Sequence, residues 1–166
     1  MSNFKTLAFP QTLDTSTHDL SQDFFIPALA HAVRYDRGVG FFSSGWLKIN
    51  ATGMVQFAAN GGRARWVTSP ILSEADWMAL QTGDEARHDP VLRAALVRNI
   101  TDLAQTLTQD TLSALAWMVA DEILTFKLAL PHHKLAVLSD LIDAEKRIQH
   151  ALLLRPSTNR CGCAHQ

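Results

Sequence analysis

The sequence has few cysteines and no long apolar segment. Only two of its 166 residues are cysteines, Cys161 and Cys163, and both lie in the last six positions. No disulfide framework therefore holds the fold. No apolar run reaches the roughly 18 residues needed to span a bilayer, and the N-terminus lacks the apolar region of a signal peptide. We expect a cytoplasmic protein that does not bind membranes.

An excess of one charge sign is also absent. Fifteen Lys and Arg residues stand against sixteen Asp and Glu residues, which gives a net charge of -1. No global basic excess indicates nucleic-acid binding, although a local basic patch is compatible with these totals. Apolar residues are plentiful, at 47% of the chain. This share and this length are typical of one globular domain with a sizeable core.

Short strand patterns alternate with helical patterns along the chain. Helical periodicity predicts one helix that begins near Phe24–Ile26. It predicts further helices over Trp46–Phe57, Glu74–Gln81, 91–107 and 109–121. Apolar runs and period-two alternation predict strands near Val39–Phe42, Arg65–Thr68, Leu124–Leu130 and Lys134–Leu138. Strands interleaved with helices predict an α/β fold, a mixed sheet with packed helices.

The chain divides into three segments. Residues 1–20 form a lead-in rich in Thr, Ser and Asp, and residues 21–140 form the α/β domain. Residues 141–166 are expected to form a C-terminal helix and a flexible tail, in which Cys161, Cys163 and His165 have no core to hold a metal ion. We expect no metal and no cofactor.

Three polar residues are expected at helix starts. Ser73 precedes a helical pattern and is followed three residues later by Asp76, which is a capping arrangement. Asp89 stands before Pro90, and proline suits the first position of a helix. Thr108 can cap the helix that follows it.

The strongest chemical signal is the segment from His132 to Asp140, which reads HHKLAVLSD. On a strand, His132 and Lys134 project from the same face because they are two residues apart. An imidazole can attack phosphorus, and an ammonium can stabilise charge on the non-bridging oxygens. Asp140 can neutralise or orient these partners from the end of the strand. A short H-x-K pattern is also typical of a polar loop.

Two further pairs are candidates for binding phosphate or nucleic acid. Arg34 and Arg37 flank Asp36, so one of them can instead form an ion pair with that carboxylate. Ser43 and Ser44 follow the first predicted strand and either face the site or cap the next helix.

Five further segments form an ordered pattern along the chain: Ile26–Leu29, Val33–Ser44, Asn60–Gly62, Val67–Pro70 and Leu72–Asp76. In this order they resemble the opening of phospholipase D-like domains of the prokaryotic branch found alone, at the N-terminus of DEAD/DEAH-type helicases, and in phage-defence and restriction proteins. His132, Lys134 and Asp140 then fall where that family carries its H-x-K…D motif. The resemblance covers roughly residues 24–140.

The resemblance implies one half of a phospholipase D-like fold and a metal-independent phosphodiesterase or nuclease. In this family's terms, His132 forms a phosphohistidine intermediate and Lys134 binds phosphate. Asp140 stands one residue later than in the commonest spacing, where Ser139 falls. The resemblance also implies nucleic acid as substrate, a DNA-processing or defence system, and a helicase or helicase domain as partner.

The chain departs from the family after this motif. Family members continue with a strand containing Gly-Ser and Asn and with a second half that supplies another histidine, and neither pattern is present. We therefore expect a truncated member with an unpaired sheet edge near Lys134–Leu138, which favours a homodimer or aggregation. Two interpretations stay open: an active phosphodiesterase, and a catalytically inactive module that binds nucleic acid or a helicase.

Overall fold

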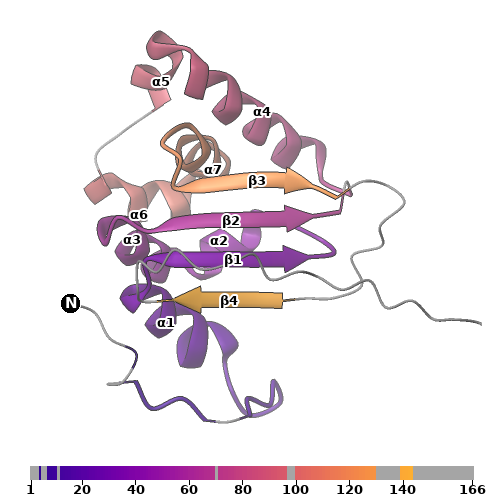
Figure 1. Cartoon of the computed structure of the whole chain (residues 1–166), viewed down its shortest axis with the longest axis vertical. Helices are drawn as coiled ribbons and strands as arrows, with labels where there is room; N and C mark the ends of the chain where they lie inside the picture. The colour runs from indigo at the N-terminus through magenta and orange to yellow at the C-terminus, as the bar shows by residue number, and fades with distance from the viewer. Residues whose placement is uncertain are drawn as a thin grey trace, which may run out of the picture.

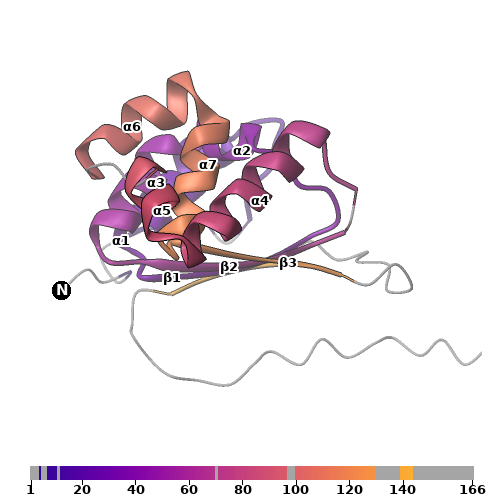
Figure 2. The same ribbon diagram turned by 90° about the horizontal axis from the view of Figure 1, so that it is seen from above.

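A four-stranded mixed sheet with its helices gathered on one face is the centre of the fold (Figures 1 and 2). The computed structural model describes residues 4, 7–10, 12–69, 71–96, 100–129 and 139–143. Figure 2 shows the described helices on one side of the strands, and no helix of the described residues lies on the other face of the sheet. The expected α/β class, a mixed sheet with packed helices, is confirmed.

The strands are β1 (Arg34–Val39), β2 (Arg63–Thr68), β3 (Leu124–Leu128) and β4 (Ser139–Asp143). They lie in the order β3-β2-β1-β4; the first three are parallel, and β4 runs antiparallel to β1. The helices are η2 (Ser21–Phe25), α1 (Ile26–His31), α2 (Gly45–Ile49), α3 (Ala51–Ala59), α4 (Glu74–His88), α5 (Pro90–Leu96), α6 (Ile100–Gln109) and α7 (Thr111–Ala120). Within the described ranges, none of them is long and apolar enough to cross a bilayer.

Strand β1 begins and ends earlier than the sequence predicts, so the strand expected at Val39–Phe42 is wrong. The strand covers Arg34–Val39, and only Val39 is shared with the prediction. The charged residues of this segment are typical of a loop when the sequence alone is considered. Arg34 and Asp36 lie on the face of the sheet opposite the described helices, which we call the open face, and their side chains are partly exposed. Tyr35 lies on the helix-facing side and is buried.

Strand β4 replaces the first turn of the helix expected from Leu141. Residues 139–143 pair with β1, with Asp140 opposite Arg37 and Ile142 opposite Tyr35. Period-two alternation explains the strand, because Asp140 and Ile142 share one face of the sheet while Leu141, on the other face, is exposed. The strand expected at Arg65–Thr68 is confirmed within β2, and the strand expected at Leu124–Leu130 is confirmed as β3 up to Leu128. Leu130 lies outside the described residues. The strand expected at Lys134–Leu138 lies outside the described residues.

Helix caps follow the sequence at two of the three expected positions. Ser73 Oγ accepts a hydrogen bond from the backbone amide three residues on, at 3.1 Å. Asp89 accepts bonds from the first amides of α5, at 2.8 and 3.2 Å. Thr108 lies inside α6, and Asp110 caps α7 instead, because its carboxylate reaches the amide of Ser113 at 3.2 Å.

Two helices expected to be continuous are divided. The pattern over 91–107 forms α5 and α6, and the pattern over Trp46–Phe57 is divided at Asn50 into α2 and α3. Asn50 is buried, and its side-chain amide donates to the carbonyl of Trp46 at 3.0 Å. A polar side chain that bonds the preceding turn competes with the helical backbone, which accounts for the break.

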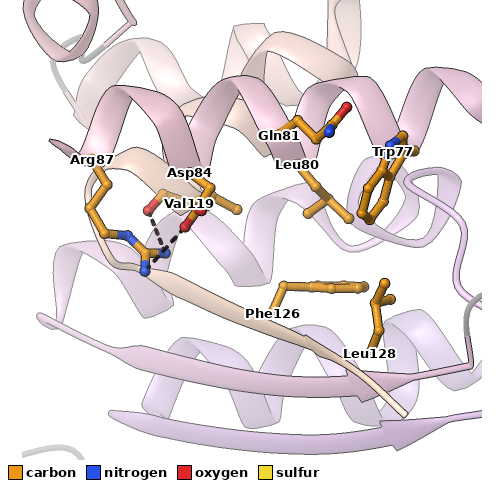
Figure 3. Close-up of a pocket in the computed structure, with 8 residues that line it drawn as sticks. All are labelled: Trp77, Leu80, Gln81, Asp84, Arg87, Val119, Phe126 and Leu128. Carbon is orange, nitrogen blue, oxygen red and sulfur yellow. Dashed lines mark hydrogen bonds and ion pairs between the residues drawn. The ribbon is translucent and has the colours of Figure 1, made fainter. Parts of the chain in front are cut away.

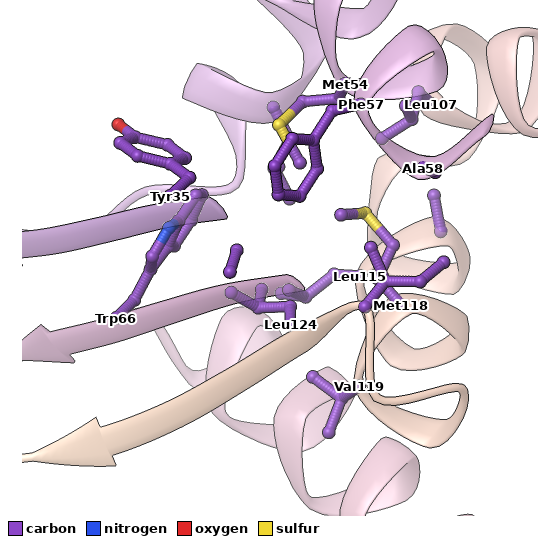
Figure 4. Packing of buried hydrophobic residues seen from close by; sticks show 14 of the residues in the cluster. Tyr35, Met54, Phe57, Ala58, Trp66, Leu107, Leu115, Met118, Val119 and Leu124 are labelled. Carbon is purple, nitrogen blue, oxygen red and sulfur yellow. The ribbon is translucent and has the colours of Figure 1, made fainter. Parts of the chain in front are cut away.

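The core lies between the sheet and the helical layer (Figure 4). Met54 and Phe57 of α3 and Leu115 of α7 are fully buried in the same cluster as Trp66 of β2 and Leu124 of β3. Burial of large apolar side chains is the main stabilising term in such a layer. The helical face predicted from Leu92 to Leu107 is only partly buried, because Leu103 and Leu107 are inside, Leu96 is half-buried and Leu92 is exposed.

Two leucines on α7 test this packing directly. Leu115 is 0% exposed and Leu112 is 36% exposed, so the same change to alanine removes core contacts only at Leu115. Leu115→Ala should lower the free energy of unfolding by about 2–5 kcal/mol. Leu112→Ala should lower it by roughly 0.5 kcal/mol. Urea denaturation measures both, and equal losses would contradict the described core.

Candidate functional site

A polar contact on the helix-facing side of the sheet joins β4 to β1. The Tyr35 hydroxyl donates a hydrogen bond to Asp140 Oδ1 at 2.7 Å, and Arg37 Nε lies 3.5 Å from the same oxygen. The Arg37 and Asp140 side chains are only 10% and 15% exposed. One carboxylate therefore serves both a phenol and a guanidinium in a nearly dry environment.

Two tryptophans complete the surroundings of Arg37. Its guanidinium carbon lies 4.4 Å from the ring centre of Trp46 and 5.5 Å from that of Trp66. The two indoles meet edge to face, with centres 5.4 Å apart. Such contacts stabilise a cation by about 0.5–2 kcal/mol, most when it is desolvated. The two rings thus fix the orientation of the guanidinium group, and the carboxylate of Asp140 neutralises its charge.

Tyr35 acts as a donor in this contact. Burial raises the pKa of its phenol well above the usual value; the charge of Arg37 opposes that rise and the charge of Asp140 adds to it. The phenol therefore stays protonated near neutral pH and donates to the carboxylate. This arrangement suits support of the fold and does not suit proton transfer.

Asp140 lies within β4, one residue after its start, and its carboxylate contacts Arg37 and Tyr35. From the sequence we expected it to neutralise or orient His132 and Lys134 from the end of a strand. His132 and Lys134 lie outside the described residues, so their roles, and that of Asp140 toward them, stay predictions.

Both neighbours of the H-x-K segment in the described chain lie at one edge of the sheet. Ala129 directly follows β3, and Ser139 is the first residue of β4. Because β4 is antiparallel to the other strands, its start lies beside their carboxyl ends. Ser43 and Ser44 belong to the segment that leaves β1 at this edge and leads to α2 (Figure 1).

The serines at this edge hold the loops that follow the parallel strands. Ser43 is exposed, and its Oγ accepts a hydrogen bond from the amide of Gly45 at 3.2 Å, which supports the capping alternative. Ser44 is the N-cap residue of α2 and makes no side-chain cap bond. Ser69 donates to the carbonyl of Gly40 and so ties the end of β2 to the end of β1.

Arg34 and Arg37, expected as a pair of phosphate ligands, lie on opposite faces of the sheet. They are three positions apart on a strand, and an odd spacing places two side chains on opposite faces. Arg34 and Arg65 both bind Asp36: Arg65 Nε lies 2.7 Å from Asp36 Oδ1, and Arg34 Nε lies 2.9 Å from Oδ2. The ion-pair alternative is thus confirmed for Arg34.

A pocket of about 340 Å³ lies between α4, α7 and the outer strand β3 (Figure 3). Its lining is Trp77, Leu80, Gln81, Asp84, Arg87, Val119, Phe126 and Leu128. Asp84 and Arg87 form an ion pair at 3.5 Å, and Arg87 also donates to the carbonyl of Val119 at 3.4 Å. Of the predicted site residues that the structure describes, none lines this pocket.

Tyr35, Trp46 and Trp66 surround Arg37 and Asp140, and none of the three was predicted from the sequence as part of the site. Alternation over residues 34–39 places Tyr35, Arg37 and Val39 on one face, and this signal was available once a strand was assigned there. The two tryptophans come from another strand and a helix, so no local pattern joins them to Arg37.

Comparisons with known proteins add no relative. No protein-family model matches the chain, no curated protein is similar to it in sequence, and no solved structure matches its fold. The functional assignment therefore rests on the residues and on their positions in the fold.

Asp36 makes the stability of the fold depend on pH. Partial burial opposes ionisation, but hydrogen bonds from Arg65 and Arg34 outweigh it and hold the pKa of Asp36 below its ordinary range. The stabilisation is complete above the unfolded value of about 3.9 and is lost as pH falls through the lower folded value. Asp36→Asn should therefore destabilise the protein at pH 7 and progressively less below about pH 4.

Urea denaturation across that range measures the difference between wild type and Asp36→Asn. Arg63→Gln is the matched control, because Arg63 lies on the same face of β2 while Arg65 holds Asp36. The control should keep the acid-dependent loss. A difference between wild type and Asp36→Asn that stays constant with pH would contradict the described ion pairs.

Proposed function

We propose that this chain is a phospholipase D-like module that cleaves phosphodiester bonds of nucleic acid, in a DNA-processing or defence system associated with a helicase. The observation that carries the proposal is the position of Ala129 and Ser139 at the carboxyl edge of the sheet. The chain between them contains His132 and Lys134. Open α/β sheets bind ligands outside the carboxyl ends of their strands, which supports a phosphate site at this edge.

The proposed reaction uses His132 as the nucleophile. Its neutral imidazole attacks phosphorus, a phosphorus–nitrogen bond forms, and the bond from phosphorus to the leaving oxygen breaks. A second imidazole, supplied by a homodimer, protonates the leaving oxygen. Water then attacks the phosphohistidine: a phosphorus–oxygen bond forms, the phosphorus–nitrogen bond to His132 breaks, and the proton of the water returns to the second imidazole. Lys134 stabilises the charge on the non-bridging oxygens, the part that a divalent metal ion plays in other phosphodiesterases.

A second candidate is a module that binds nucleic acid or a helicase without cleaving. Asp140 favours it, because the carboxylate of the H-x-K…D pattern contacts Arg37 and Tyr35 on the helix-facing side. A carboxylate engaged in the fold is less free to orient a catalytic histidine. Cleavage assays separate the two candidates.

His132→Ala should abolish hydrolysis of a generic phosphodiester and of single- and double-stranded DNA in excess EDTA. His133→Ala is the matched control; it should cost far less, because on a strand His133 points to the other face. Activity of the wild type should fall below about pH 6.5, where an ordinary imidazole protonates and can no longer attack.

Two outcomes would contradict this mechanism: cleavage that persists in His132→Ala, and cleavage that EDTA stops. A wild-type chain that cleaves none of these substrates under any condition would favour the binding module.

A further inference from the structure

The open face of the sheet carries a diagonal row of cations, Arg63 and Arg65 on β2 and Lys127 on β3, which we name the cationic row. All three are exposed, and the side chain of Arg65 is 58% exposed. Arg63 and Arg65 share a face because they are two residues apart on β2. Lys127 pairs with Val67 in the β2–β3 register, which places it on the same face two residues beyond Arg65 and one strand across.

The register fixes the length of the cationic row. Residues advance about 3.3 Å along a strand, and neighbouring strands lie about 4.8 Å apart. Arg63 and Lys127 are four register positions and one strand apart, so the row is about 14 Å long between backbone positions. One strand of duplex DNA carries a phosphate every 3.4 Å or so along the helix axis, so the row spans about four phosphates.

The described residues of this face have a surplus of positive charge, in a chain whose net charge is -1. The charged residues among them are Arg34, Arg63, Arg65, Lys127, Asp36 and Asp143, four cations and two carboxylates. Asp36 is shared by Arg34 and Arg65. In the described part of the chain, no carboxylate forms an ion pair with Arg63 or Lys127. A surplus confined to one face attracts a polyanion.

The described uncharged side chains of this face contain no aromatic ring; they are Val67, Thr125 and Leu141. Proteins that hold single strands stack the bases on aromatic side chains, so this face suits a ligand whose bases are already stacked inside a helix. We propose that the cationic row binds the phosphate backbone of duplex DNA without reading its sequence. The inference rests on the proposed function for the class of ligand, and it concerns a different surface from the carboxyl edge.

The test is binding of a fluorescently labelled duplex to the His132→Ala chain in EDTA, measured by anisotropy from about 50 to 200 mM salt. Each lost phosphate contact lowers the slope of log affinity against log salt by about 0.9. Across that range, the parent should lose roughly tenfold more affinity than Arg63→Gln/Lys127→Gln, which lacks two contacts. Lys127→Gln alone should lower the slope by about half as much as the double variant.

Lys48→Gln is the matched control for Lys127→Gln, because Lys48 is an exposed lysine on α2, in the helical layer. The control should keep the salt slope of the parent chain. Equal slopes in both variants, binding of single strands only, or no binding of the duplex would overturn the proposal; the last would favour an acidic protein surface as the occupant.

The His132→Ala background separates this result from the proposed function. If the wild type cleaves nothing but the cationic row sets the salt slope, the binding surface stands and the phosphodiesterase proposal fails. If the wild type cleaves DNA but the slopes of the two lysine variants are equal, the cationic row is overturned and the phosphodiesterase proposal stands.

Discussion

The contact of Arg37 with Asp140 is the constraint on which the position of β4 depends. A guanidinium that is 10% exposed is costly unless a carboxylate faces it. Asp140 on β4 supplies that carboxylate. It lies 105 residues after Tyr35 in the sequence, although the two side chains are in contact. A slip of β4 by one residue would turn Leu141 toward Arg37 and move Asp140 to the open face. The buried cation thus selects a single register for the antiparallel edge of the sheet.

Side chains alternate along β1, so the two faces of the sheet carry different groups. Tyr35 and Arg37 face the helices and belong to the link with β4, whereas Arg34 and Asp36 face the open side. Arg65 of β2 joins the open-face pair through Asp36. Three parts of the sheet are therefore distinct: the buried contact of β1 with β4, the open face with its cations, and the edge where the parallel strands end and β4 begins. Each can be altered without direct change to the other two.

The parts of the fold that depend on local signals could be predicted from the sequence. Ser73 and Asp89 mark helix starts because capping is a contact with the next turn. Strand β3 was recognisable because its apolar residues alternate. Strand β1 was misplaced because a strand with one solvated face can carry charges that look like a loop. Strand β4 was taken for a helix because its apolar pair, Leu141 and Ile142, fits either period, and only its partner decides.

In the candidate site, too, contacts between residues close in the sequence could be predicted, whereas contacts between distant residues could not. An ion pair of Asp36 with Arg34 or Arg37 was one of two alternatives from the sequence, because these residues are close in the chain, and the structure has it with Arg34. The contact of Arg37 with Asp140 was not predicted, because it depends on which strands become neighbours and in which register. The tryptophans around Arg37 depend on the same tertiary choice. His132 and Lys134 lie outside the described residues and stay predictions.

A double-mutant cycle on Arg37 and Asp140 tests the central claim most directly. Arg37→Met keeps an apolar stem against the tryptophans, and Asp140→Asn keeps the shape of the side chain without its charge. Each single change should lower the free energy of unfolding by roughly 3–5 kcal/mol, because it leaves the other charge buried and unpaired. The double variant should be at least about 1 kcal/mol more stable than the two losses added together imply. Losses that add to within about 0.5 kcal/mol would show that the two residues do not interact and that β4 is held by other contacts.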